Sequence, residues 1–175
     1  MSLRESIKHK HDEAENHRFV KYLFSGSIST NIYANYLYNQ SLAYKALEDR
    51  ANDLGLLEDF LSIQRYEHIV NDLQEFNYPT KELPSTTSYI SYVANLPSAS
   101  ILSHVYVRHM GDMFGGAMLK KVVPGSGTMY DFENRSEIIQ RLRAKLDDSM
   151  GLEANVVFDF VIQLYEELSL EYDIQ

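Results

Sequence analysis

Apolar side chains recur along most of the chain at intervals of three or four residues, which is the period of an amphipathic helix. Glycine and proline fall between these periodic stretches, where helices are expected to end. No stretch shows the strict alternation of apolar and polar residues that is typical of a half-buried strand, and no internal repeat is present. The pattern therefore predicts an all-α protein.

Local signals place the ends of the predicted helices. Ser2 and Glu5 have the spacing of a capping box, so the first helix is expected to start at residue 3. Further helices are expected over 18–23, 30–52, 57–76 (one or two helices), 85–95, from the cap Ser98 to before Pro124, 134–150 and 152–172, with a loop over 77–84. A chain of 175 residues is expected to form a single domain over 1–175.

The segment 108–121 reads as the middle of a long helix and yet contains three glycines. Each glycine destabilises a helix interior by roughly 1 kcal/mol relative to alanine. Gly111 and Gly115 share one face, and Gly116 widens the gap in side chains. Such a bare face can bend, and it lets a ligand approach the backbone. With Asp112 at its edge, the segment predicts a kinked helix that holds a flat ligand beside one carboxylate; the alternative is close packing of a second helix.

The predicted first helix carries a row of polar side chains on one face. Arg4, Lys8, His11 and Glu15 are spaced by four, three and four residues, so they are neighbours on a helix surface. An imidazole beside a carboxylate is typical of a metal ligand and the group that orients it. The two cations are suited to hold anionic groups of a ligand.

Four segments stand out in chain order: 11–16, 44–48, 106–121 and 162–168. They read His-Asp-Glu-Ala-Glu-Asn, Tyr-Lys-Ala-Leu-Glu, Tyr-Val-Arg-His-Met-Gly-Asp-Met-Phe-Gly-Gly followed by Leu119-Lys120-Lys121, and Ile-Gln-Leu-Tyr-Glu-Glu-Leu. Together they resemble the proximal-histidine, distal-tyrosine, distal-helix and last-helix segments of the helical heme (haem) oxygenase family. One such segment is a weak signal, but four in family order span nearly the whole chain.

This resemblance implies a helical bundle with heme between a proximal N-terminal helix and a kinked distal helix. It implies an enzyme that uses heme as both substrate and cofactor. The ring is opened at a meso carbon to give biliverdin, ferrous iron and carbon monoxide, with O2 and electrons from an external donor.

The resemblance also implies roles for individual residues. His11 is expected to bind the iron, and Glu15 to orient its ring. Asp112, in a water network with Tyr44 and Arg108, is expected to deliver a proton to the oxygen chemistry. The remaining residues expected to contact heme are Arg4, Lys8, Tyr106, Gly111, Gly115, Gly116, Arg143, Phe158 and Val161.

The chain departs from the family pattern in three places. Phe114 stands where the family commonly has serine, so its ring either adds bulk near the distal pocket or points away. Val161 replaces a polar residue that is common in the last helix. The stretch 132–158 is shorter than in typical members, which affects the match of Arg143 to the arginine that binds a heme propionate.

Composition excludes several classes of partner and cofactor. The chain has 25 acidic and 16 basic residues, a formal charge of −9, which argues against nucleic acid as a general partner. There is no cysteine, so disulfides, thiolate heme ligation and iron–sulfur clusters are excluded. No apolar run reaches the ~18 residues of a membrane span, and no signal core is present. We expect a cytoplasmic protein without a membrane anchor.

The expected electron donor is a ferredoxin or a flavin-dependent reductase, and a bilin reductase is an expected downstream partner. Six cations are expected to form a basic rim for the donor near the exposed heme edge: Arg4, Lys8, Lys21, Arg141, Arg143 and Lys145.

Other interpretations compete with these. His11 has five rivals: His9, His17, His68, His104 and His109. Met110 and Met113 could ligate iron, although packing is their more ordinary role. A heme carrier or sensor without turnover would need His11 but not Asp112. A thiaminase-like enzyme on the same architecture would need an acidic pocket and a nucleophile, and no cysteine is available.

Overall fold

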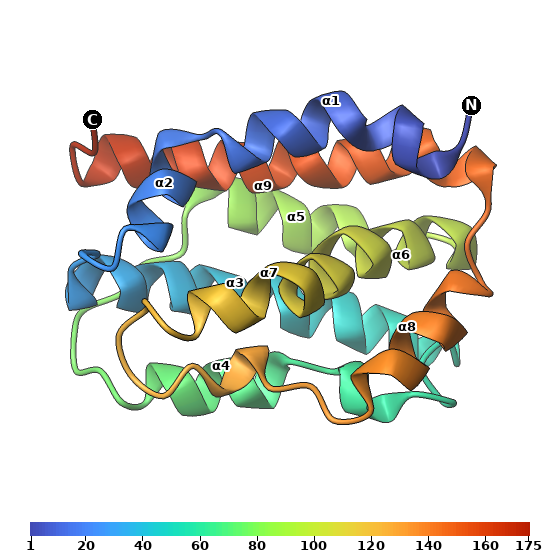
Figure 1. Ribbon diagram of the computed structural model, residues 1–175, viewed down its shortest axis with the longest axis horizontal. Coiled ribbons are helices and arrows are strands. Elements are labelled where there is room, and N and C mark those ends of the chain that lie inside the picture. Colours follow the sequence, from blue (N-terminus) through green and yellow to red (C-terminus); the bar gives the residue numbers. More distant parts are fainter.

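The computed structural model describes residues 1–175 and contains helices and connecting segments but no strand (Figure 1). The all-α prediction is confirmed. The elements are α1 (Leu3–Glu15), α2 (Arg18–Phe24), α3 (Thr30–Asp53), the 3-10 turn η1 (Leu61–Ile63), α4 (Tyr66–Leu73), α5 (Pro84–Val93), α6 (Ser98–Val105), the π-turn η2 (Tyr106–Met110), α7 (Gly111–Leu119), the 3-10 turn η3 (Thr128–Tyr130), α8 (Arg135–Arg143), the 3-10 turn η4 (Asp148–Met150) and α9 (Gly151–Glu171).

The helices form a layered bundle. α1 runs along the outer side of α9, and α6 contacts both α9 and α3 (Figure 1). α7 overlaps α3 in this view and contacts α2 and η3. The long helix α3 is buried along much of its length and also contacts α4 and α5. No helix is long and apolar enough to cross a membrane.

The capping box predicted for the first helix is present. The Ser2 side chain accepts from the Glu5 backbone N–H, and the Glu5 carboxylate accepts from the Ser2 backbone N–H. Leu3 and Ile7 are buried, and the Leu3 backbone N–H donates to Asp148 just before α9. This fixes which side of α1 faces the bundle and leaves the opposite side open.

The predicted distal helix is interrupted one turn earlier than the glycines suggest. Residues Tyr106–Met110 form a π-turn that joins α6 to α7 without a break in the chain. A π-turn inserts one residue into the helical register and is frequent at functional sites. Pro97, and not Ser98, occupies the position before the first residue of α6, because its fixed φ suits an extended cap.

Two other predicted helices are shorter than expected. The stretch 57–76 contains only η1 and α4, and α8 ends at Arg143 before a turn that leads to η4. Gly151 begins α9 with helical dihedrals, and an added Cβ there would lie 2.7 Å from Cβ of Ser6 in α1. It thus permits close contact between the two helices.

Candidate active site

His11 lies on the open side of α1 with 47% of its side chain exposed. Its Nε2 atom is 3.5 Å from the Glu15 carboxylate, and its Nδ1 atom is 3.7 Å from that of Asp12. Phe158 of α9 presents its ring edge-on, with the ring centroids 6.0 Å apart. The imidazole is therefore oriented by neighbours and still accessible, as a metal ligand must be before its metal binds.

Gly111 and Gly115 leave one face of α7 bare. A Cβ added at either position would meet no atom within 4 Å, whereas one added at Gly116 would lie 2.8 Å from the Tyr130 ring. The predicted stripe of three glycines therefore divides in two. Gly111 and Gly115 border open space, and Gly116 allows Tyr130 to pack against the helix, so it does not share their open face.

This difference gives a prediction that separates folding from ligand binding. Gly111→Ala should raise the free energy of unfolding by up to about 1 kcal/mol, because the dihedrals are helical and the added methyl group meets no clash. It should also impair ligand turnover, because the methyl group projects into the open space. Gly116→Ala should lower that free energy by about 1–3 kcal/mol through overpacking against Tyr130. Urea unfolding of the ligand-free variants, measured beside turnover, would show both effects; equal effects of the two changes on stability would contradict this division of roles.

Asp112 stands at the edge of the bare face and is partly buried. The buried Tyr44 hydroxyl of α3 donates a short hydrogen bond to its Oδ2 atom. Burial raises the pKa of Asp112 to about 6, against the lowering effects of the Tyr44 hydrogen bond and of the charges of His109, Arg108 and Arg65. Burial also raises the pKa of Tyr44 well above its ordinary value, so its phenol keeps the proton that it donates. The contact between Tyr44 and Asp112 agrees with the family resemblance, which placed both residues in one network.

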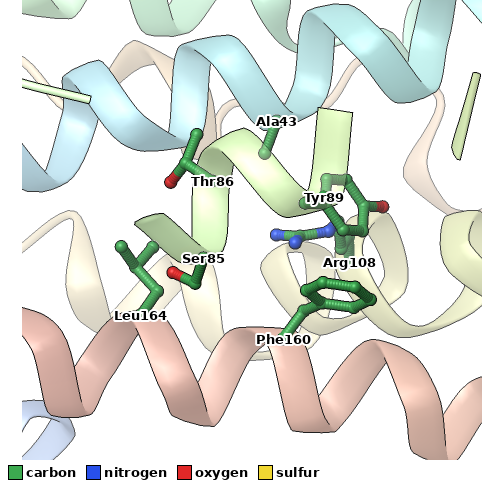
Figure 2. A pocket seen from close by; sticks show the side chains of 7 residues that line it. All are labelled: Ala43, Ser85, Thr86, Tyr89, Arg108, Phe160 and Leu164. Carbon is green, nitrogen blue, oxygen red and sulfur yellow. The ribbon is translucent and has the colours of Figure 1, made fainter. Parts of the chain in front are cut away.

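Arg108 does not form an ion pair with Asp112. Its guanidinium carbon lies 4.1 Å from the centre of the Tyr89 ring, its Nη1 makes only a long 3.5 Å contact with Gln40, and its Nε has no partner. Figure 2 shows the guanidinium between Tyr89 and Phe160, beside a cavity of about 10 Å³, which is about the size of one water molecule. The π-turn shifts the helical register, so the four-residue spacing no longer aligns Arg108 with Asp112.

Phe114 points outward, with 53% of its surface exposed. The guanidinium carbons of Arg135 and Arg143 lie 5.1 and 5.9 Å from its ring centre. The ring is thus exposed to solvent, and it lies more than 4 Å from a Cβ added at Gly111. Arg143 and Arg4 also act together on Tyr106, since both lower its pKa against the larger raising effect of burial.

The last helix supplies side chains between α1 and the distal segment. Phe158 is buried, and Val161 is half-buried. Tyr165 follows on α9; burial raises its pKa to about 12, with a further contribution from the charge of Asp112. The structure thus joins Asp112 of α7 with Tyr44 of α3 and Tyr165 of α9, and it joins His11 of α1 with Phe158 of α9.

Comparison with known proteins agrees with this arrangement. The family model for heme oxygenase matches residues 1–155. This chain belongs to the heme oxygenase family. The heme oxygenase of Guillardia theta is 30% identical over 98% of this chain and 86% of the relative, and that of Rhodella violacea is 26% identical over 98% and 87%.

Solved structures of heme oxygenases share the fold. The enzyme from Leptospira interrogans superposes with a TM-score of 0.81 at 25% identity, over 95% of this chain and 100% of that one. Heme oxygenase-1 from Synechocystis in complex with heme gives a TM-score of 0.82 at 23% identity, over 97% and 91%. The chain is thus an enzyme of heme degradation, and a heme carrier or a thiaminase-like enzyme is not favoured.

Several residues of this heme oxygenase were missed from sequence. His104 and His109 were considered only as rivals of His11, and both prove to be completely buried. Glu48 and Arg65 form a buried network behind Tyr44, and no role was expected for either. Glu48 could have been found, because it ends the segment that begins with Tyr44 and lies one helical turn away on the same face. Arg65 lies in an irregular segment between η1 and α4, and no motif or spacing in the sequence indicated a role for it.

Proposed function

We propose that this chain opens heme at a meso carbon to yield biliverdin, ferrous iron and carbon monoxide, using O2 and electrons from an external donor. The observation that carries the proposal is the Tyr44–Asp112 pair at the edge of the bare face formed by Gly111 and Gly115. A flat substrate can approach the backbone there, with a single proton-carrying group beside it.

His11 is proposed as the iron ligand from the proximal side. Its imidazole is accessible, and Glu15 lies within reach of Nε2, so this carboxylate can orient the ring. Phe158 limits the tilt of the ring from the α9 side. Heme supplies the redox chemistry when bound, and the protein supplies orientation.

On the distal side, Asp112 is proposed to move protons. Tyr44 donates to one of its oxygens, which leaves the other oxygen free to hold a water. A pKa of about 6 lets the carboxyl group exchange a proton near neutral pH. Arg108 contributes a buried positive charge that lowers the pKa of Asp112. No carboxylate pairs with its guanidinium.

Arg4, Arg143 and Tyr106 are proposed to hold the heme propionates. The charges of both arginines, one from α1 and one from α8, lower the pKa of the Tyr106 phenol against the effect of burial. Lys8 is less available for this role, because its ammonium group pairs with Asp12 at 2.5 Å. Glu15, Gly115 and Val161 remain proposed heme contacts.

We propose that a ferredoxin or a flavin-dependent reductase delivers the electrons, and that a bilin reductase consumes the product. Of the expected rim, Arg141 pairs with Glu137 and Lys145 with Asp59. The cations around Phe114 do not form such pairs, so Arg135 and Arg143 present positive charge beside an exposed aromatic ring. This face suits a donor with an acidic surface.

Reduction by a plant-type ferredoxin should slow as salt is added, because exposed charges are screened within ~10 Å at 0.1 M salt. Arg135→Gln should slow reduction at low salt and flatten the salt dependence. Arg141→Gln on the same helix is the matched control, because its charge is already paired with Glu137. Stopped-flow reduction rates at several salt concentrations, with heme affinity measured separately, would test this. Equal effects of the two changes would remove the proposed docking face.

The proposed reaction is tested by adding hemin to the protein and then ascorbate in air. Loss of the Soret band with formation of extractable biliverdin supports it. A stable ferrous–oxygen spectrum would identify a carrier instead, and the absence of a Soret shift on adding hemin would remove heme binding as well.

A further inference from the structure

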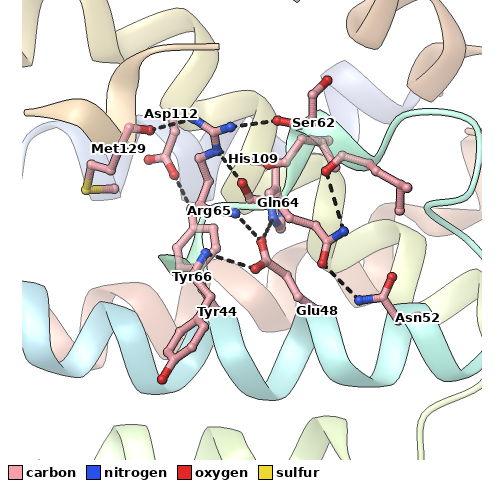
Figure 3. Close-up of polar contacts among 12 residues, drawn as sticks. Tyr44, Glu48, Asn52, Ser62, Gln64, Arg65, Tyr66, His109, Asp112 and Met129 are labelled. Atoms are coloured by element: carbon pink, nitrogen blue, oxygen red, sulfur yellow. Dashed lines mark hydrogen bonds and ion pairs between the residues drawn. The ribbon is translucent and has the colours of Figure 1, made fainter. Parts of the chain in front are cut away.

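A second buried pair lies directly behind the Tyr44–Asp112 pair. His109 of η2 has no exposed side-chain surface, and its Nε2 atom is 2.8 Å from Oε2 of Glu48 in α3, whose side chain is only 4% exposed. Figure 3 shows this pair on the same side of α3 as Tyr44. Neither residue has a role in the proposed reaction so far.

Glu48 is fixed from three directions. Its Oε2 atom accepts from the Arg65 backbone N–H at 2.7 Å, and its Oε1 atom accepts from the Tyr66 backbone N–H at 3.0 Å (Figure 3). Both amides stand at the start of α4, where helical N–H groups lack helical acceptors. The carboxylate cannot rotate without losing these bonds, so it holds His109 in one orientation.

His109 in turn contacts Tyr44. The ring centroids are 4.9 Å apart and the rings meet at 73°, an edge-on contact. The Nδ1 atom of His109 is buried and has no hydrogen-bond partner, so Glu48 alone anchors this ring through a hydrogen bond. The contacts therefore run without a gap from Glu48 through His109 and Tyr44 to Asp112.

Many groups act on Asp112, and His109 is the one imidazole among them. The phenols come from α3, η3 and α9, and burial raises the pKa of each, so all stay neutral: Tyr33, Tyr36, Tyr44, Tyr130 and Tyr165. The other charges are Arg65, from the segment before α4, and Arg108 of η2, which remain positive. His109 combines a charge that acts on Asp112 with a ring that contacts Tyr44.

We propose that His109, anchored by Glu48, is a positioning residue for the Tyr44–Asp112 pair: its ring seats the Tyr44 phenol, and its charge governs how readily Asp112 releases a proton. The role in turnover rests on the proposed function, whereas the coupling between the two groups does not. Distal proton delivery in this chain thus depends on a titratable residue that touches neither heme nor oxygen.

The test uses the heme-free protein, so it does not depend on turnover. The Asp112 carboxyl carbon, assigned with Asp112→Asn, is followed by ¹³C NMR from pH 4 to 9, and the His109 ring by ¹⁵N NMR in the same samples. In the wild-type protein the Asp112 curve should change wherever the ¹⁵N signals show a change in the protonation of His109, as coupled groups do. A curve for Asp112 that does not respond to His109 would overturn the proposal.

Two variants sharpen the result. His109→Phe keeps a ring against Tyr44, and His109→Gln keeps a donor to Glu48, but both remove the charge. Each should raise the Asp112 midpoint by about one pH unit, because a nearby cation is lost. His104→Gln is the matched control: His104 is equally buried on the same distal segment and also bonds a glutamate, Glu153, but it lies against Tyr89 and not against Tyr44.

An unchanged Asp112 midpoint in either folded His109 variant, or an equal shift in His104→Gln, would overturn the proposal. If only one His109 variant folds, its Asp112 curve and that of the wild-type protein still decide the proposal, because the wild-type curve needs no substitution. Biliverdin formation is measured separately. A protein that shows the coupling but makes no biliverdin would contradict the proposed function and leave the coupling standing.

Discussion

Replacing Asp112 by alanine is expected to stop biliverdin formation while heme still binds. The carboxyl group is the proposed proton carrier at the edge of the bare face, and Tyr44 donates a hydrogen bond to it. Positioned proton transfer contributes about 100- to 10,000-fold to rates, so the yield of biliverdin should fall by about 100-fold or more. Single-turnover absorption spectra with ascorbate in air, followed by pigment extraction, measure this directly.

Two companion variants interpret that result. Asp112→Asn should be intermediate, because an amide can hold a water but cannot relay a proton as a carboxyl group does. Asp131→Ala is the matched control, since Asp131 is 53% exposed and only pairs with Lys120 at the surface. Without controlled proton delivery, the Asp112→Ala protein should oxidise added phenols in the manner of a peroxidase. Full biliverdin yield from Asp112→Ala would show that Asp112 has no part in the chemistry, although heme binding would stand.

His11→Ala should remove the proximal bond to iron and most of the turnover. Mutation of a group that only orients a metal ligand lowers metal affinity or activity by about 10- to 100-fold. Loss of the ligand itself should therefore lower turnover by more than this factor. The electronic spectrum of the heme complex should change, and added imidazole should partly restore it, because the imidazole can occupy the space that the side chain leaves beside Phe158.

His9→Ala is the matched control for this change. His9 lies two residues earlier on the same exposed helix and has no aromatic or acidic partner, so its loss should leave spectrum and turnover intact. A His11→Ala complex with the wild-type spectrum in the absence of imidazole would contradict the assignment of the iron ligand.

Much of this architecture can be read from the sequence, because local rules determine it. The capping box at Ser2 and Glu5 fixed the start of α1 and, through helical spacing, the shared face of His11 and Glu15. The contact between Tyr44 and Asp112 was expected from the family resemblance and not from any local rule. Patterns of spacing succeed where each residue sits on a regular helix.

The parts that could not be predicted arise where the helix is irregular or the partner is remote in sequence. On a regular α-helix the four-residue spacing of Arg108 and Asp112 would allow an ion pair, but the π-turn alters the register, and Arg108 stacks on Tyr89 instead. His109 was not expected to be fully buried, because its partner Glu48 lies 61 positions away and only the tertiary fold brings them together. No periodic pattern carries that information.

The bare face of α7 has a consequence for any attempt to stabilise this enzyme. Gly111 and Gly115 border open space in the folded protein, so alanine at either position improves the helix without a clash. A redesign that ranks substitutions by folding stability would therefore choose both changes and fill the space proposed for the substrate. On that proposal, thermal robustness and activity should vary in opposite directions among variants at these two positions.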